Sequence, residues 1–110
     1  MKEIKITFDL SPDLNLVDGV LTLTKDKVTA EYNSTKIEYS ISDIEEAVQY
    51  TDIGCGRLEL KVKNGKDDQS DNLPLCRFSM TYVSEIGEFT KVLNHLIKTG
   101  ELTDISTKDL

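Results

Sequence analysis

The feature that most constrains this chain is a change in the spacing of its apolar residues near residue 80. Before that point apolar and polar residues alternate in short runs, which is the spacing of half-buried β-strands. After it, residues 81–99 place apolar side chains three or four positions apart, as an amphipathic helix does. The pattern predicts a mainly β (α+β) domain in which strands come first and one helix closes the chain.

Turn signals divide the first part of the chain into seven expected strands. Breaks are expected at residues 11–13, 25–26 and 33–34, and a tight turn at Gly54-Cys55-Gly56. The expected strands carry alternating apolar residues: Ile4, Ile6, Phe8, Leu10, Leu21, Leu23, Val28, Ala30, Tyr32, Ile37, Tyr39, Ile41, Leu58, Leu60, Val62, Cys76 and Phe78. The fifth strand is expected at residues 47–50 and the last at residues 73–78, after a long polar loop that ends near Asn72.

The expected helix has a clear start signal and a clear stop signal. Ser79 or Thr81 is expected to cap its N-terminus, and Gly100 is expected in the left-handed conformation just after its end. Its apolar residues cover half of the helical wheel, whereas His95 falls on the opposite, wet half. Residues 1–100 therefore form one domain, and residues 101–110 are expected to be a flexible tail or linker.

Seven antiparallel strands and one broad amphipathic helix predict a specific architecture. Closing the strands into a barrel removes exposed sheet edges, and the helix then covers one open end. This is a pleckstrin-homology-like (PH-like) barrel or sandwich capped by a long C-terminal helix. A β-sandwich with the helix packed outside is the alternative.

Charge and composition exclude several classes of function. Thirteen Lys and Arg residues against twenty Asp and Glu residues give a net charge of −7, which disfavours nucleic acid as a partner. The first loop, residues 11–18, holds two acidic residues and no basic one, so direct phosphoinositide binding is not expected. His95 is the only histidine, which excludes histidine clusters and leaves a single imidazole for any catalytic triad.

No residue set points to catalysis, a cofactor or a metal. The carboxylates at residues 45–46 and 67–68 are sequence neighbours, and neighbours in a strand point to opposite faces, so neither pair is expected to act as an acid–base pair. The acids of the polar loop do not have the spacing of a calcium loop. Cys55 would have only His95 as a base. Cys55 and Cys76 are expected to be reduced thiols of a cytoplasmic protein, although a single disulfide between them stays open. An enzyme is therefore not expected.

Four segments resemble a known family. Residues 7–14, the turn at residues 54–59, Cys76-Arg77-Phe78-Ser79 and the helix end at residues 92–97 resemble the N-terminal region of bacterial ABC transporter proteins of the exporter type. The resemblance implies a cytoplasmic PH-like accessory domain at the inner face of the membrane, which packs against the transporter domains of a longer parent chain or recruits a protein partner. ATP hydrolysis is then confined to other domains of that chain. It also implies that the gene continues past Leu110. A free-standing PH-like protein that binds a peptide or small ligand is the alternative.

The architecture also suggests where a protein or peptide partner would bind. In such barrels the edge of the fifth strand lies beside the helix and can accept an added strand. The residues expected to line this groove are Val48 and Tyr50 on the strand and Ile86 and Thr90 on the helix.

Overall fold

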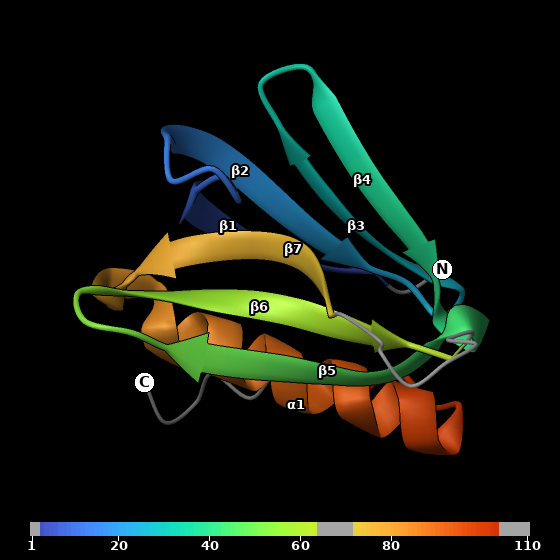
Figure 1. Ribbon diagram of the computed structural model, residues 1–110. Helices are drawn as coiled ribbons and strands as arrows, with labels where there is room; N and C mark the ends of the chain where they lie inside the picture. The colour runs from blue at the N-terminus through green and yellow to red at the C-terminus, as the bar shows by residue number, and fades with distance from the viewer. Residues whose placement is uncertain (1–2, 64–71, 104–110) are drawn as a thin grey trace.

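The computed structural model describes residues 3–63 and 72–103, and Figure 1 shows their arrangement. Seven strands and one α-helix follow one another along the chain. The strands are β1 (Ile4–Leu10), β2 (Leu16–Leu23), β3 (Lys27–Tyr32), β4 (Thr35–Ser40), β5 (Ile44–Thr51), β6 (Cys55–Val62) and β7 (Leu73–Ser79). Two single turns of 3₁₀-helix, η1 (Ile41–Asp43) and η2 (Met80–Tyr82), precede β5 and the helix α1 (Val83–Thr99). The predicted mainly β fold with one C-terminal helix is confirmed.

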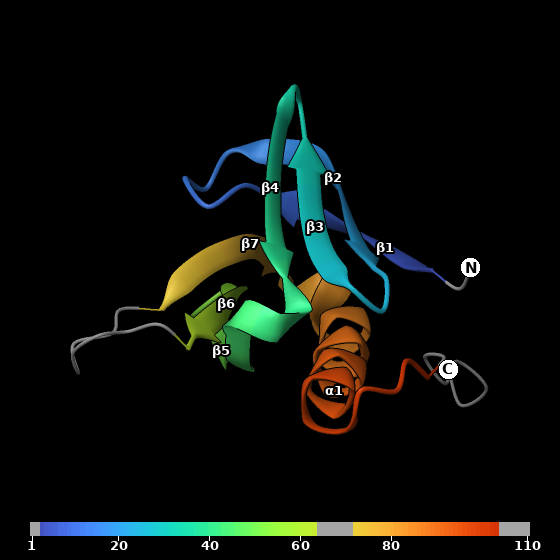
Figure 2. The same ribbon diagram turned by 90° about the vertical axis from the view of Figure 1, so that its right-hand side faces the viewer.

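All seven strands belong to one antiparallel sheet with the order β4-β3-β2-β1-β7-β6-β5. The chain therefore forms two meanders, β1–β4 and β5–β7, that meet where β1 lies beside β7 at the pair Leu10 and Arg77. Figure 2 shows that the sheet bends there into two layers, with α1 packed along β5. The sheet begins at β4 and ends at β5, which are joined through η1 and are not paired with each other.

The core lies between the bent sheet and the apolar side of α1. Phe8, Phe78 and Phe89 are fully buried in it, and they come from β1, β7 and α1. Leu58, Leu60, Cys76 and Phe78 face inward as predicted, and Ile86, Phe89, Leu93 and Leu96 form the buried face of the helix. The change of apolar period near residue 80 therefore marks the change from the sheet to the helix that covers it.

The bulge in β7 was not predicted. Leu58 pairs with Cys76, but the next pair is Glu59 with Pro74, so Leu75 is an extra residue on β7. A bulge of this kind interrupts the strict alternation of faces. Leu75 and Cys76 are consequently both fully buried, although they are neighbours in the sequence.

The helix ends as predicted but begins differently. Gly100 adopts φ +80° and its N–H donates to the carbonyl of Leu96 at 2.8 Å, which closes the C-terminus of α1. The expected capping by Ser79 or Thr81 is wrong, because η2 is interposed and α1 starts after Tyr82 with no side-chain cap. The Ser79 N–H instead donates to Asp9 Oδ1 at 2.8 Å, across the junction of β7 and β1.

The two glycines beside Cys55 have different roles, and the three residues are not one tight turn as predicted. Only Gly54 has a positive φ, of +81°. Gly56 lies within β6, where a Cβ atom would collide with the ring of Phe78. The fifth strand is also longer than the predicted residues 47–50, since β5 runs over Ile44–Thr51.

The predicted polar loop at residues 64–71 and most of the predicted tail, residues 104–110, lie outside the described residues. Within the described part of the chain, no helix combines the length and the apolar character needed to cross a membrane.

Candidate functional site

The outer edge of β5 is the part of the sheet that lies beside α1. Asp52 N–H donates to the Cys55 carbonyl at 2.7 Å and closes a tight turn between β5 and β6. Because hydrogen-bonded and non-hydrogen-bonded pairs alternate along an antiparallel ladder, Tyr50 and Val48 bond across to β6. The backbone groups of Ala47, Gln49 and Thr51 therefore point away from β6, toward the helix and the open edge.

Asn94 of α1 pairs with the first of these outward-facing residues, Ala47. Its Oδ1 accepts the Ala47 N–H at 2.8 Å, and its Nδ2 donates to the Ala47 carbonyl at 2.9 Å. The side-chain amide thus pairs with the strand as a neighbouring strand would. Asn94 sits at the border of the apolar helix face, and no local sequence pattern points to a partner 47 residues away.

Further along the edge, toward Thr51, fewer of the strand's backbone groups have hydrogen-bond partners. Gln49 Nε2 donates to the Val83 carbonyl at 3.2 Å, which ties the strand to the first turn of α1. Among the described residues, the outward backbone groups of Gln49 and Thr51 have no hydrogen-bond partner. The hydrogen bonds that join β5 to α1 are therefore made by Ala47 and Gln49 of the strand with Asn94 and the Val83 carbonyl of the helix.

The structure does not bring the four predicted groove residues to one surface. Val48 and Tyr50 pair with Glu59 and Arg57, so they project from the outer face of the sheet. Ile86 and Thr90 are buried under the opposite face, where the Thr90 hydroxyl donates to the Ile86 carbonyl at 2.7 Å. The sheet itself lies between the two pairs.

Tyr50 belongs instead to a polar cluster on the outer face. The Arg57 guanidinium lies 4.3 Å from the centre of the Tyr50 ring, and it donates to Asp52 at 2.7 Å and to Glu59 at 2.8 Å. The hydrogen bond to Asp52 raises the pKa of Arg57, whose charge is thus held between two carboxylates. Asn72 adds a hydrogen bond to the Tyr50 hydroxyl at 3.2 Å. This cluster fastens β5 to β6, and its cation, Arg57, is already paired with two carboxylates.

A hollow of about 270 Å³ lies at the other end of the contact between β5 and α1. It is lined by Glu45, Glu46, Asn94, Ile97 and Lys98. Its acidic strand side and single lysine make it polar, and the Asn94 bridge closes it on the side of Ala47. Glu45 and Glu46 both line this hollow, so the expectation that they point to opposite faces is wrong. The register irregularity between Ile44 and Glu46 interrupts the alternation of the strand there.

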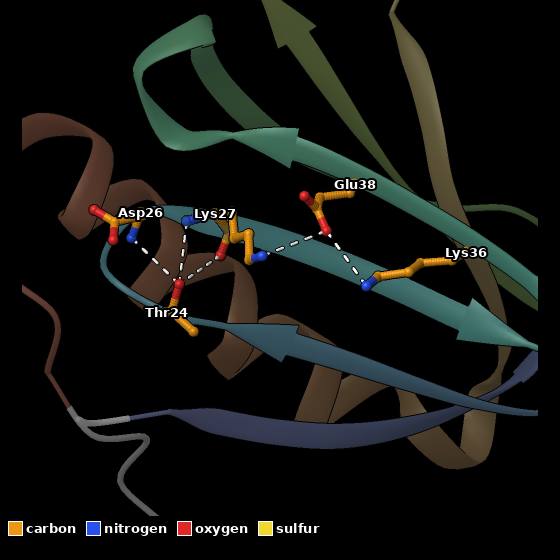
Figure 3. A network of polar contacts seen from close by, with 5 residues as sticks. All are labelled: Thr24, Asp26, Lys27, Lys36 and Glu38. Atoms are coloured by element: carbon orange, nitrogen blue, oxygen red, sulfur yellow. Dashed lines mark hydrogen bonds and ion pairs between the residues drawn. The ribbon is translucent and has the colours of Figure 1, made fainter.

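The opposite edge of the sheet, β4, is protected by charge. Glu38 Oε1 lies 3.6 Å from both Lys27 Nζ and Lys36 Nζ, while Thr24 accepts the N–H groups of the β2–β3 turn (Figure 3). Charged side chains on an edge strand discourage the addition of another strand. β5 is therefore the edge with the better access for a partner.

The thiols and the histidine are not arranged for catalysis. Burial, together with the nearby Asp9 carboxylate, raises the pKa of the Cys76 thiol, so it stays protonated. Cys55 is half-buried and both cysteines are free. Cys55 pairs with Ser79 near the start of α1, whereas exposed His95 lies about 18 Å further along the helix axis. Cys55 and His95 therefore do not form a pair.

Among residues 3–63 and 72–103, no three His, Cys, Asp or Glu side chains lie close enough to hold a metal ion. Comparison of the chain with protein families, with curated proteins and with solved structures finds no match.

Proposed function

We propose that this chain is a non-catalytic interaction domain that accepts an extended peptide segment as an added strand along β5. The observation that carries this proposal is the open edge beyond the Asn94 bridge. There β5 ends the sheet, and Gln49 and Thr51 direct their backbone groups away from β6. A peptide that adds to such an edge gains main-chain hydrogen bonds, and its side chains give specificity.

The Asn94 bridge sets where an added strand would stop. Ala47 already has both backbone groups bonded to the Asn94 amide, so the peptide would extend from Gln49 toward the β5–β6 turn. Two outward residues supply only a short ladder, and each hydrogen bond contributes about 0.5–1.5 kcal/mol net. Most of the affinity would therefore come from contacts of the peptide side chains with α1 and the turn.

Thr51→Pro tests this proposal because proline removes the outward N–H at that position and leaves the ladder to β6 intact. Thr51→Ala is the matched control, since it keeps the N–H and removes only the side chain. Short random peptides displayed on phage would be selected against the full chain. We expect peptides whose binding is lost in Thr51→Pro and retained in Thr51→Ala. Selected peptides that bind both variants equally would refute strand addition at β5.

The setting we propose is the N-terminal module of a bacterial ABC transporter protein of the exporter type, located in the cytoplasm. The resemblance of residues 7–14, 54–59, 76–79 and 92–97 to that family supports it. In that setting the gene continues past Leu110 into a cysteine-rich segment, membrane helices and a nucleotide-binding domain with the phosphate-loop motif. Reading the gene downstream tests this, and a stop codon directly after Leu110 would favour a free-standing peptide- or ligand-binding protein.

A further inference from the structure

The exposed apolar side chains of this molecule gather at one end. Four large hydrophobic residues are exposed in the described chain: Leu14 (54%), Leu16 (83%), Ile53 (100%) and Met80 (40%). Leu14 lies on the β1–β2 connection, Leu16 begins β2, Ile53 lies in the β5–β6 turn and Met80 begins η2. Figure 1 shows these segments at the left end of the molecule. Single exposed apolar residues are normal on a protein surface. A group of four at the same end of the molecule is typical of an interaction surface.

The strand register explains why these connections lie at the same end of the molecule. Arg77 pairs with Leu10 on one side and with Arg57 on the other, so β1, β7 and β6 are aligned at this end. The β1–β2 and β5–β6 connections are then separated by about three strand spacings, roughly 14 Å. This distance is within the reach of a short peptide segment. We call the end that bears Leu14, Leu16, Ile53 and Met80 the apolar end.

Leu14 is held outward by an ordered loop. Ser11 is buried; its carbonyl accepts the Leu14 N–H at 2.9 Å, and its hydroxyl accepts the Asn15 N–H at 3.2 Å. Leu14 itself has φ +69°, a conformation that a leucine rarely adopts. Glycine or asparagine would fit this position at a lower backbone cost. The loop thus keeps an apolar side chain in solvent in spite of a disfavoured backbone.

The connections at the apolar end carry only acidic charges. The segments 11–18, 51–55 and 79–85 contain Asp13, Asp18, Asp52 and Glu85, all exposed, and no Lys or Arg. Asp52 is paired with Arg57 of β6, so Asp13, Asp18 and Glu85 supply the negative charge of this surface. A hollow of about 220 Å³ opens near the start of β2, and its lining includes Asp9, Val17, Asp18 and Tyr82. Acidic groups next to apolar groups match a partner that offers a cation next to apolar side chains. The same charge repels anionic lipid and a second copy of this acidic chain.

We propose that the apolar end is a docking surface for a protein segment in which apolar residues flank a lysine or an arginine. The cationic side chain enters the hollow between Asp9 and Asp18, and the flanking apolar residues cover Leu14, Leu16 and Ile53. This inference goes beyond strand addition at β5: it rests on Leu14, Leu16 and the hollow lined by Asp9 and Asp18, and it shares only the β5–β6 turn with that proposal.

Phage-displayed random peptides, selected against the full chain, are the probe. We expect the selected peptides to carry Lys or Arg beside Leu, Ile or Phe. Leu16→Asp should weaken their binding at least tenfold, because a large apolar contact is replaced by a charge. Ser42→Asp, an exposed change of the same charge in η1, should leave binding unchanged. Leu16 is 83% exposed, so its replacement should not disturb the fold.

A second pair of variants separates local charge from net charge. Asp18→Asn and Asp26→Asn each remove one exposed negative charge, but only Asp18 lines the hollow. We expect Asp18→Asn to weaken binding two- to fivefold and Asp26→Asn to have no effect beyond the measurement error. Equal effects of both substitutions would overturn the proposal.

Other outcomes would also overturn it. These are a selection that yields no peptides, peptides without a basic residue, or peptides whose binding is lost in Thr51→Pro but retained in Leu16→Asp. The last result would support strand addition at β5 alone. Binding to vesicles of phosphatidylcholine and phosphatidylserine that is lost in Leu16→Asp would identify a membrane as the occupant. Concentration-dependent dimers that Leu16→Asp abolishes would identify a second copy.

Discussion

Replacing Asn94 with alanine would uncover the edge of β5 at Ala47. The Asn94 amide makes two hydrogen bonds to this residue, at 2.8 and 2.9 Å, and no other side chain bonds its backbone in the described structure. Ala47 is only 3% exposed, so its N–H and carbonyl would be left without partners at a nearly buried site. The substitution therefore removes a bridge between sheet and helix that lies outside the apolar core.

The size of the effect follows from these contacts. An unpaired buried N–H or carbonyl costs about 1–3 kcal/mol. The hollow lined by Asn94 would admit water to the uncovered edge, which favours the lower part of that range. For the two groups together we expect a loss of about 2–4 kcal/mol in the free energy of unfolding. This corresponds to a decrease of about 1–2 M in the urea midpoint.

Urea unfolding followed by circular dichroism would measure this change, and native-state hydrogen exchange would localise it. The Ala47 amide should exchange slowly in the original chain and rapidly in Asn94→Ala, because its acceptor is gone. His95→Ala is the matched control, since His95 is the exposed neighbour on the same helix. Asn94→Asp adds a test of orientation. It keeps an acceptor for the N–H but turns a carboxylate oxygen toward the Ala47 carbonyl, so it should be at least as destabilising as alanine.

Two results would refute this reasoning. One is an Asn94→Ala protein whose free energy of unfolding lies within about 0.5 kcal/mol of the His95→Ala protein. The other is an Ala47 amide that exchanges at the same rate in both proteins. Either result would mean that water or a shifted side chain pairs with the edge as well as the Asn94 amide does.

Three further predictions concern stability. Phe89→Ala should lower the free energy of unfolding by about 3–5 kcal/mol, because Phe89 is fully buried. His95→Ala should lower it by less than about 0.5 kcal/mol. Equal urea midpoints for the two proteins would contradict the helix orientation. Leu14→Gly should leave the thermal midpoint unchanged or raise it, because glycine accepts φ +69° freely, while Leu14→Val should lower it. The raised pKa of Cys76 keeps the folded thiol protonated above the ordinary value of 9.0, where the unfolded thiol ionises. Stability should therefore fall as the pH rises above 9, by up to about 1.4 kcal/mol per pH unit, and Cys76→Ala should remove this part of the slope in pH-dependent urea titrations.

Much of the fold follows from local sequence signals. The alternation around Leu58 and Leu60 and the period of the helix reflect which side of each element is buried, and this is a property of neighbouring residues. Gly100 is similarly local, since its positive φ requires no distant partner. The start of the helix was not predictable in this way. Ser79 could not be read as the partner of Asp9, because this hydrogen bond joins residues 70 positions apart.

The contact between β5 and α1 was predictable as a pairing of elements but not as a set of side chains. Val48 and Tyr50 were expected to line the groove beside the helix, because the fifth strand ends the sheet there. A register irregularity between Ile44 and Glu46 changes the alternation of the strand, so that Ala47 and not Glu46 faces inward with Ile44. Bulges depend on the pairing of two strands, and a single strand's sequence does not reveal them.

The junction of β1 with β7 has a consequence for how the chain folds. Each meander is built from hairpins between neighbouring strands, which form within microseconds. The junction instead joins Leu10 to Arg77 and Asp9 to Ser79, so its formation closes a loop of most of the chain. Closing such a loop costs conformational entropy before any contact compensates for it, and folds rich in such contacts fold slowly. The two halves should therefore acquire hairpin structure first, and the rate-limiting barrier should lie at their docking. In kinetic terms, Asp9→Ala should slow folding, whereas changes in the Asn33-Ser34 hairpin turn should act mainly on the rate of unfolding.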